Sequence, residues 1–115
     1  MDVNDALIQS QYQEIRRGSV VIAVLSLLRS PQYGYALLER LSQAGFEVEA
    51  NTLYPLLRRL EKQGLLAAKW TTDEARPRKY YQTSTAGTDA LAMLADEWRK
   101  LTGSLDSLLD KGDTA

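Results

Sequence analysis

The sequence predicts a mainly α-helical domain with one small β-hairpin. Leucines recur at helical spacing in residues 51–63, two short strand-like segments follow at residues 65–71 and 78–83, and a long leucine-rich helical segment closes the chain. The first pattern is typical of an amphipathic helix and the second of a hairpin. The length of 115 residues fits one domain with a modest core, which a partner subunit would help to stabilise.

The composition excludes several classes of function. The chain contains no Cys and no His, which rules out disulfides, thiolate chemistry, most metal sites and the usual general bases. The sequence has no nucleotide-binding loop and no Ser-His arrangement, and no pair such as Asp96 and Glu97 is spaced to face one substrate from a helix. We therefore expect neither an enzyme nor a bound cofactor.

One apolar segment raises the question of a membrane. The run at residues 20–28 is too short to span a bilayer, and no basic-flanked signal sequence precedes it. A buried core helix is the interpretation we prefer. The lack of Cys is consistent with a reducing compartment, and we expect the protein in the cytoplasm.

The first predicted helix, at residues 5–17, is polar with scattered apolar positions. Such an exposed helix needs a partner surface to cover its apolar side chains. Gly18 should break or bend this helix. Ser19 then caps a core helix that runs through Leu28, and Pro31 blocks its continuation.

A further helix is predicted for residues 33–44, because Tyr35, Leu38 and Leu41 recur at three-residue spacing. Leu37 widens the buried stripe that these residues form. The alternation of apolar and acidic residues at 46–49 indicates an extended link to the next helix.

The next helix, at residues 51–63, is strongly amphipathic. Asn51 or Thr52 caps its start, and Pro55 is tolerated because it falls in or near the first turn. Its buried face carries Leu53, Leu56, Leu57 and Leu60. Its opposite face collects Asn51, Pro55, Arg58 and Lys62, with Arg59 at the margin. Gly64 ends the helix.

The two strands of the hairpin enclose a loop at residues 72–77. Side chains alternate between the faces of a strand, so one of Tyr80 and Tyr81 should pack on the core and the other should stay free. Asp73 and Glu74 in the loop would repel phosphate unless they turn away.

Charge is distributed unevenly along the chain. The net charge is −1, yet residues 52–82 carry seven basic side chains against three acidic ones, which leaves the rest of the chain at −5. Local rather than total charge decides where a polyanion docks.

Three helices followed by a basic hairpin predict a winged helix-turn-helix. In such a fold the third helix enters the major groove of DNA, and the hairpin, or wing, touches the phosphate backbone. The predicted DNA contacts are Asn51, Thr52, Tyr54, Pro55, Arg58, Arg59, Lys62, Arg76, Arg78, Lys79 and Tyr81. The alternative is a solvated helix face and a hairpin whose charges only protect its edges.

The closing helix carries a heptad-like apolar stripe at spacings of 3, 4, 3, 4 and 3 residues. The stripe consists of Leu91, Leu94, Trp98, Leu101, Leu105 and Leu108. This pattern is typical of a helix that packs along another helix, and we interpret it as a dimer interface. Trp98, beside Leu94, either packs within that interface or offers a stacking platform to a flat aromatic ligand.

The sequence resembles the PadR-like transcriptional regulators along nearly its whole length. The resemblance rests on Arg17-Gly18, Tyr33-Gly34-Tyr35-Ala36-Leu37-Leu38, Thr52-Leu53-Tyr54-Pro55-Leu56-Leu57-Arg58-Arg59-Leu60-Glu61, Gly64-Leu65-Leu66, Arg78-Lys79-Tyr80-Tyr81 and Thr85-Ala86-Gly87. The single C-terminal helix looks like the compact branch of that family. In the wing loop the sequence lacks the glycines common in the family, and Leu91 and Leu94 are bulky where a ligand would need space.

The resemblance implies a homodimeric DNA-binding repressor, often of efflux, detoxification or stress genes. The last helix would be the dimerisation arm, the N-terminal helix would pack on the mate, and Trp98 stands where some relatives bind planar aromatic compounds. We expect a DNA-binding domain at residues 1–85, a dimerisation helix at 86–110 and a disordered tail at 111–115. The alternative function is a winged-helix module that contacts only proteins.

Overall fold

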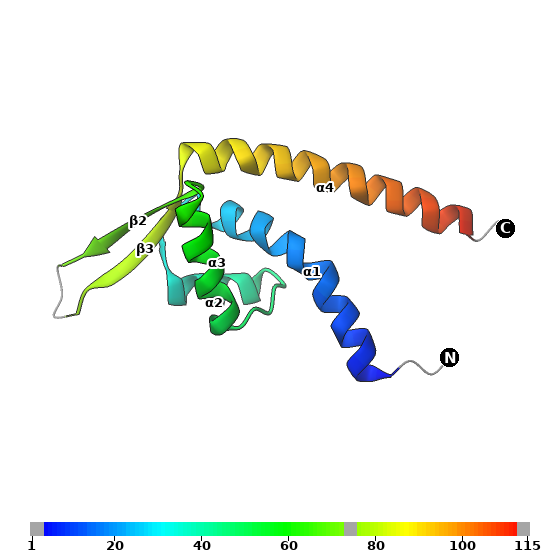
Figure 1. The fold of residues 1–115 in the computed structure, drawn as a ribbon, viewed down its shortest axis with the longest axis horizontal. Coiled ribbons are helices and arrows are strands. Elements are labelled where there is room, and N and C mark those ends of the chain that lie inside the picture. Colours follow the sequence, from blue (N-terminus) through cyan, green and yellow to red (C-terminus); the bar gives the residue numbers. More distant parts are fainter. Residues whose placement is uncertain (1–3, 73–75, 113–115) are drawn as a thin grey trace.

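The computed structural model describes residues 4–72 and 76–112. The elements in chain order are α1 (Asp5–Leu27), β1 (Gln32–Tyr33), α2 (Gly34–Gln43), α3 (Ala50–Lys62), β2 (Leu66–Thr71), β3 (Arg78–Thr83) and α4 (Thr85–Gly112). The β2–β3 hairpin projects from one side of the helical body, and α4 projects from the other (Figure 1). The predicted fold class, mainly helical with a small antiparallel sheet, is confirmed.

The core lies where α1, α2, α3 and the hairpin meet. Leucines dominate it because each helix presents one apolar stripe inward. The buried residues are Val24, Leu25, Leu28, Leu37, Leu41, Leu53, Leu57, Leu60, Leu66 and Tyr81. The prediction that residues 20–28 form a core helix is thus confirmed at its last two turns.

Gly18 does not break helix α1, so that alternative of the prediction was wrong. The helix runs without interruption from Asp5 to Leu27, and Asn4 caps it by accepting hydrogen bonds from the Ala6 and Leu7 amides. Ser19 is not a cap, because its hydroxyl donates to the Arg16 carbonyl within the same helix. Glycine costs a helix only about 1 kcal/mol relative to alanine, so the favourable residues on either side carry the helix through.

Helix α2 begins next to a strand that the sequence did not reveal. Gln32 and Tyr33 form β1, which pairs with β3 and gives the sheet order β1-β3-β2. Leu37 and Leu41 of α2 are fully buried, as is Gly34. Tyr35 was predicted to face the core with Leu38 and Leu41, but it is 59% exposed.

The start of α3 also differs in detail. Glu49 occupies the cap position without a side-chain hydrogen bond, so neither Asn51 nor Thr52 is the cap. Pro55 lies inside the helix rather than in its first turn, and it cannot donate to the Asn51 carbonyl because proline lacks an N–H group. Gly64 does end the helix, at a φ of 82° that glycine tolerates.

Helix α4 is fastened directly to the base of the hairpin. The Ser84 hydroxyl accepts from the Gly87 amide at 3.0 Å and donates to the Gly64 carbonyl at 2.6 Å. Gly87 lies so close to the Leu65 carbonyl that a side chain would collide with that backbone group. The long helix therefore leaves the domain at a direction that the wing base determines.

Candidate nucleic-acid interface

Helix α3 presents the polar and basic face that the sequence predicts. Leu53, Leu57 and Leu60 anchor the helix in the core. The exposed side chains on its outer side are Asn51, Thr52, Pro55, Arg58, Arg59 and Lys62. A helix anchored on one face and basic on the other can enter the major groove as a rigid unit.

Tyr54 has a structural task besides its predicted contact with DNA. The residue is partly buried, and its ring lies against Gly34 at the start of α2. A Cβ atom on Gly34 would stand 2.5 Å from Tyr54 Cε1, so a side chain at this position would force the tyrosine ring to move. The contact fixes the spacing between α2 and α3, the two helices of the helix-turn-helix.

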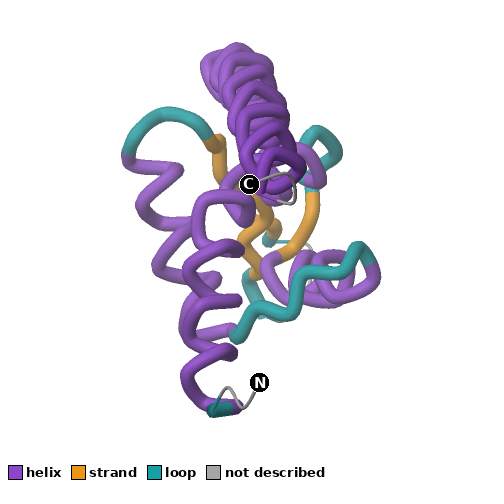
Figure 2. The backbone as a smooth tube through the Cα atoms, turned by 90° about the vertical axis from the view of Figure 1, so that its right-hand side faces the viewer, coloured by secondary structure: helices purple, strands orange, loops and turns teal. Residues whose placement is uncertain are grey.

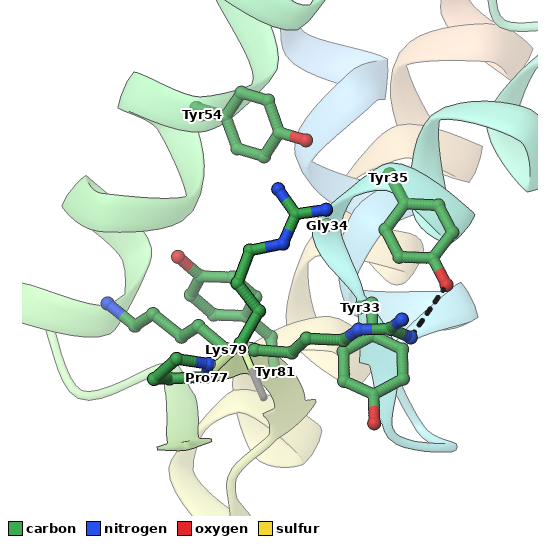
Figure 3. Close-up of a pocket in the computed structure, with 9 residues that line it drawn as sticks. Tyr33, Gly34, Tyr35, Tyr54, Pro77, Lys79 and Tyr81 are labelled. Carbon is green, nitrogen blue, oxygen red and sulfur yellow. Dashed lines mark hydrogen bonds between the residues drawn. The ribbon is translucent and has the colours of Figure 1, made fainter. Parts of the chain in front are cut away.

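Arg78 of the wing contacts two tyrosine side chains at the start of α2. Its guanidinium lies 5.5 Å from the centre of the Tyr33 ring, and Nη1 donates to the Tyr35 hydroxyl at 3.5 Å. The Tyr33 and Tyr35 rings are stacked, with centroids 5.8 Å apart (Figure 3). Cation–π contact and the hydrogen bond together orient the exposed arginine. The sequence prediction had assigned neither tyrosine to the site.

An open recess of about 470 Å³ separates the wing from the helices. Figure 3 shows Tyr35 and Tyr54 on its helical side and Pro77 and Lys79 on its wing side. Arg76 and Arg78 also line it. The basic residues of the wing and Tyr54 of α3 therefore border the same recess, and the basic charge beside it suits a polyanion.

Lys79 does not extend into solvent as expected for a simple phosphate contact. Its Nζ atom donates to Glu61 Oε1 of α3 at 3.0 Å, and it lies near the rings of Trp70 and Tyr81. The hydrogen bond to Glu61 raises the pKa of Lys79 above its ordinary value, and partial burial opposes that rise. The ammonium is therefore charged at neutral pH, and its contribution to stability is lost only as the pH rises through this raised pKa.

The last strand of the wing buries one of its two tyrosines. Tyr81 is only 5% exposed and belongs to the core, so the prediction that it contacts DNA was wrong, whereas the prediction that one of the two tyrosines packs inward is confirmed. Asp73 and Glu74, predicted to repel phosphate, lie outside the described residues.

An apolar stripe is exposed along α4. Leu94 and Trp98 are 37% and 40% exposed, and exposure rises to 65% at Leu108. Leu91 differs, because it packs against the core of its own domain. The predicted tail also differs, since Lys111 and Gly112 still belong to α4, and residues 113–115 lie outside the described part.

Helix α1 carries a second set of exposed apolar side chains. Leu7 and Ile15 are more than half exposed, and Tyr12 is 41% exposed. Helices α1 and α4 contact each other, and they diverge toward the two chain ends, which Figure 1 and Figure 2 show apart. Contiguous exposed apolar side chains are typical of interaction sites. Within the described residues, no helix is long and apolar enough to cross a membrane.

Known proteins share this arrangement. A PadR family transcriptional regulator of Eggerthella lenta has a similar structure, with a TM-score of 0.87 and 48% sequence identity over 91% of this chain and 94% of that one. A PadR-like transcription factor of Bacteroides fragilis gives a TM-score of 0.72 and 30% identity over 86% of this chain and 98% of that one. A transcriptional regulator of Mycobacterium tuberculosis is 35% identical over 80 residues, which is 69% of this chain and 75% of that protein.

The family model named Transcriptional regulator PadR-like matches residues 22–93. These residues contain the core end of α1, the helix-turn-helix, the wing and the first turns of α4. The match covers more than half of the chain, and the chain therefore belongs to the PadR-like family of DNA-binding transcriptional regulators, which are not enzymes.

Proposed function

We propose that this protein is a homodimeric, sequence-specific repressor in which α3 contacts bases in the major groove of DNA and the wing contacts the phosphate backbone. One observation carries the proposal: Arg76 and Arg78 of the wing border an open recess together with Tyr54 of α3, a helix whose outer side is exposed and basic. Residues 1–85 would bind DNA, and residues 86–110 would form the dimerisation arm. The base-reading residues would be Asn51, Tyr54 and Arg58, with Arg76 and Arg78 on phosphates.

The proposed dimer forms through the stripe on α4. A symmetric mate would cover Trp98, Leu101, Leu105 and Leu108 and would also bury the apolar side of α1. The two copies of α3 would then enter successive major grooves, roughly 34 Å apart on one side of the duplex. A dimer seated on an operator excludes other proteins from that DNA, which supports repression as the output.

The proposed place of action is the cytoplasm. The similar regulators named above come from bacteria, in which the chromosome lies in that compartment.

Replacing Arg78 with alanine should weaken binding to all duplexes by a similar factor. A phosphate contact adds affinity without sequence information, so the slope of log affinity against log salt should fall by about 1. Fluorescence anisotropy with a duplex selected from a random pool, measured from low to moderate salt, tests this. Arg99→Ala, an exposed arginine on α4, is the matched control and should keep the wild-type slope. Failure of the wild-type protein to bind any duplex at low salt would favour the protein-contact module instead.

We further propose that a planar aromatic compound releases the repressor by stacking on Trp98. The half-exposed indole beside Leu94 on the dimer stripe supports this, since a flat ligand could lie between the indoles of two subunits. Planar cationic or phenolic compounds should quench tryptophan fluorescence in Trp70→Ala but not in Trp98→Ala. Saturable binding that survives Trp98→Ala would place the ligand elsewhere.

A further inference from the structure

The outer part of the wing has no third strand to hold it. β1 pairs with β3 only at Tyr80 and Tyr81, whereas the β2–β3 ladder continues outward through the pairs Trp70 with Lys79 and Thr71 with Arg78. A two-stranded ribbon is marginally stable by itself in water. The direction of this outer part therefore depends on side-chain contacts with the helical body.

Two consecutive residues supply such contacts on opposite faces of β3. Arg78 reaches Tyr33 and Tyr35 at the start of α2, and Lys79 reaches Glu61 in the last turn of α3. This divergence follows from the pleat, which turns neighbouring side chains to opposite sides. Neighbouring residues of the wing thus attach it to both helices of the helix-turn-helix.

The pair of Lys79 and Glu61 differs from the other ion pairs described. Arg17 with Glu14, and Lys100 with Asp96, each lie within one helix and are more than half exposed. Lys79 and Glu61 join two elements, with side chains only 26% and 36% exposed. The rings of Trp70 and Tyr81 also lie near the ammonium group, at 5.9 and 5.2 Å from it to their centroids.

We propose that Glu61 and Lys79 are positioning residues that set the direction of the wing relative to α3, so that both engage one duplex together. This inference rests on the proposed DNA interface. It gives an acidic side chain on the recognition helix a favourable effect on DNA binding, although a negative charge near phosphate would otherwise oppose binding. It also assigns Lys79 a task other than the predicted phosphate contact.

The sign of the effect of Glu61→Gln tests the proposal. If Glu61 acts only as a negative charge, its removal should leave DNA affinity unchanged or raise it. If it positions the wing, affinity for the selected duplex should fall about threefold to fivefold, the range expected for a partly exposed ion pair. Glu49→Gln is the matched control, because Glu49 is an exposed acid at the other end of α3, and its affinity should stay equal or rise.

A double-mutant cycle with Lys79→Gln separates coupling from independent effects. We expect the double variant E61Q/K79Q to bind no more weakly than K79Q alone, since the pair is already broken there. Amide hydrogen exchange should accelerate in residues 69–71 and 78–79 of E61Q without DNA, while that of the buried part of α1 stays unchanged.

Three results would overturn the inference: E61Q that binds as tightly as the wild type or tighter, losses that multiply in the double variant, or unchanged exchange in the wing. Absence of duplex binding by the wild-type protein is a different result, since it would refute the proposed DNA interface itself. The hydrogen-exchange measurement needs no DNA and tests the contact between wing and α3 in either case.

Discussion

Replacement of Leu101 and Leu105 together with glutamate should convert the protein to monomers and lower its affinity for an operator about a hundredfold or more. Both leucines are at least half exposed in the single chain. Burial of a leucine is worth about 1.5–3 kcal/mol, and a glutamate in the same place would have to be desolvated without a partner. The dimer would lose its central contact.

The large loss of affinity for the operator is expected because a dimer binds two linked half-sites. A dimer binds its second half-site at a high effective concentration, whereas a monomer must bind each one separately. Sedimentation velocity measures the change in mass, and anisotropy with full-site and half-site duplexes measures the change in affinity. Affinity for a single half-site should change little, because α3 and the wing are untouched.

A matched control places the same two charges on the other side of α4. Gly103 and Ser107 lie away from the stripe, since successive residues of a helix are turned by about 100°. Gly103→Glu with Ser107→Glu should remain dimeric and bind the full site normally. A dimer that persists in the Leu101 and Leu105 variant would show that the apolar stripe is not the interface.

Local periodicity explains why most of the interface could be predicted. The leucine spacing in residues 53–60 determines which side of α3 is buried, so the exposed position of Arg58 and Lys62 follows from the sequence. The hairpin could be predicted equally well, since β2 and β3 begin within one residue of the predicted positions. Both patterns involve residues close together in the chain.

Contacts between distant segments could not be predicted in this way. A strand of two residues has no periodicity, so β1 and its pairing with Tyr80 leave no pattern in the sequence. Tyr35 has the same three-residue spacing as Leu38 and Leu41, and only the packing of α2 decides that the tyrosine is exposed while the two leucines pack on the core.

The position of Lys79 is an intermediate case. Alternation along β3 places it on the same face as Tyr81 once that tyrosine is known to be buried. The identity of its partner, Glu61, depends on how the hairpin folds back along α3. The side of β3 on which Lys79 lies could therefore be predicted from the sequence, but its contact with Glu61 could not.

Arg58 and Arg59 should differ strongly in their importance for DNA binding, although they are neighbours of equal charge. Arg58 lies at helical spacing from Tyr54 and from Glu61. Tyr54 lines the wing recess, and Glu61 accepts a hydrogen bond from Lys79 of the wing. Arg59 lies on the other margin of α3, next to Leu56 and away from the wing. A duplex that touches both α3 and the wing must therefore face Arg58.

Arg58→Ala should weaken binding to the selected duplex about tenfold to a hundredfold, as expected for loss of a bidentate base contact, and should relax the preference at one base pair. Arg59→Ala should cost about threefold or less, because it would remove at most one screened phosphate contact. Binding of both variants to single-base variants of the operator measures the difference. Equal losses that are uniform across all sequences would mean that Arg58 contacts phosphate rather than a base, and a larger loss at Arg59 would place the duplex on the opposite side of α3.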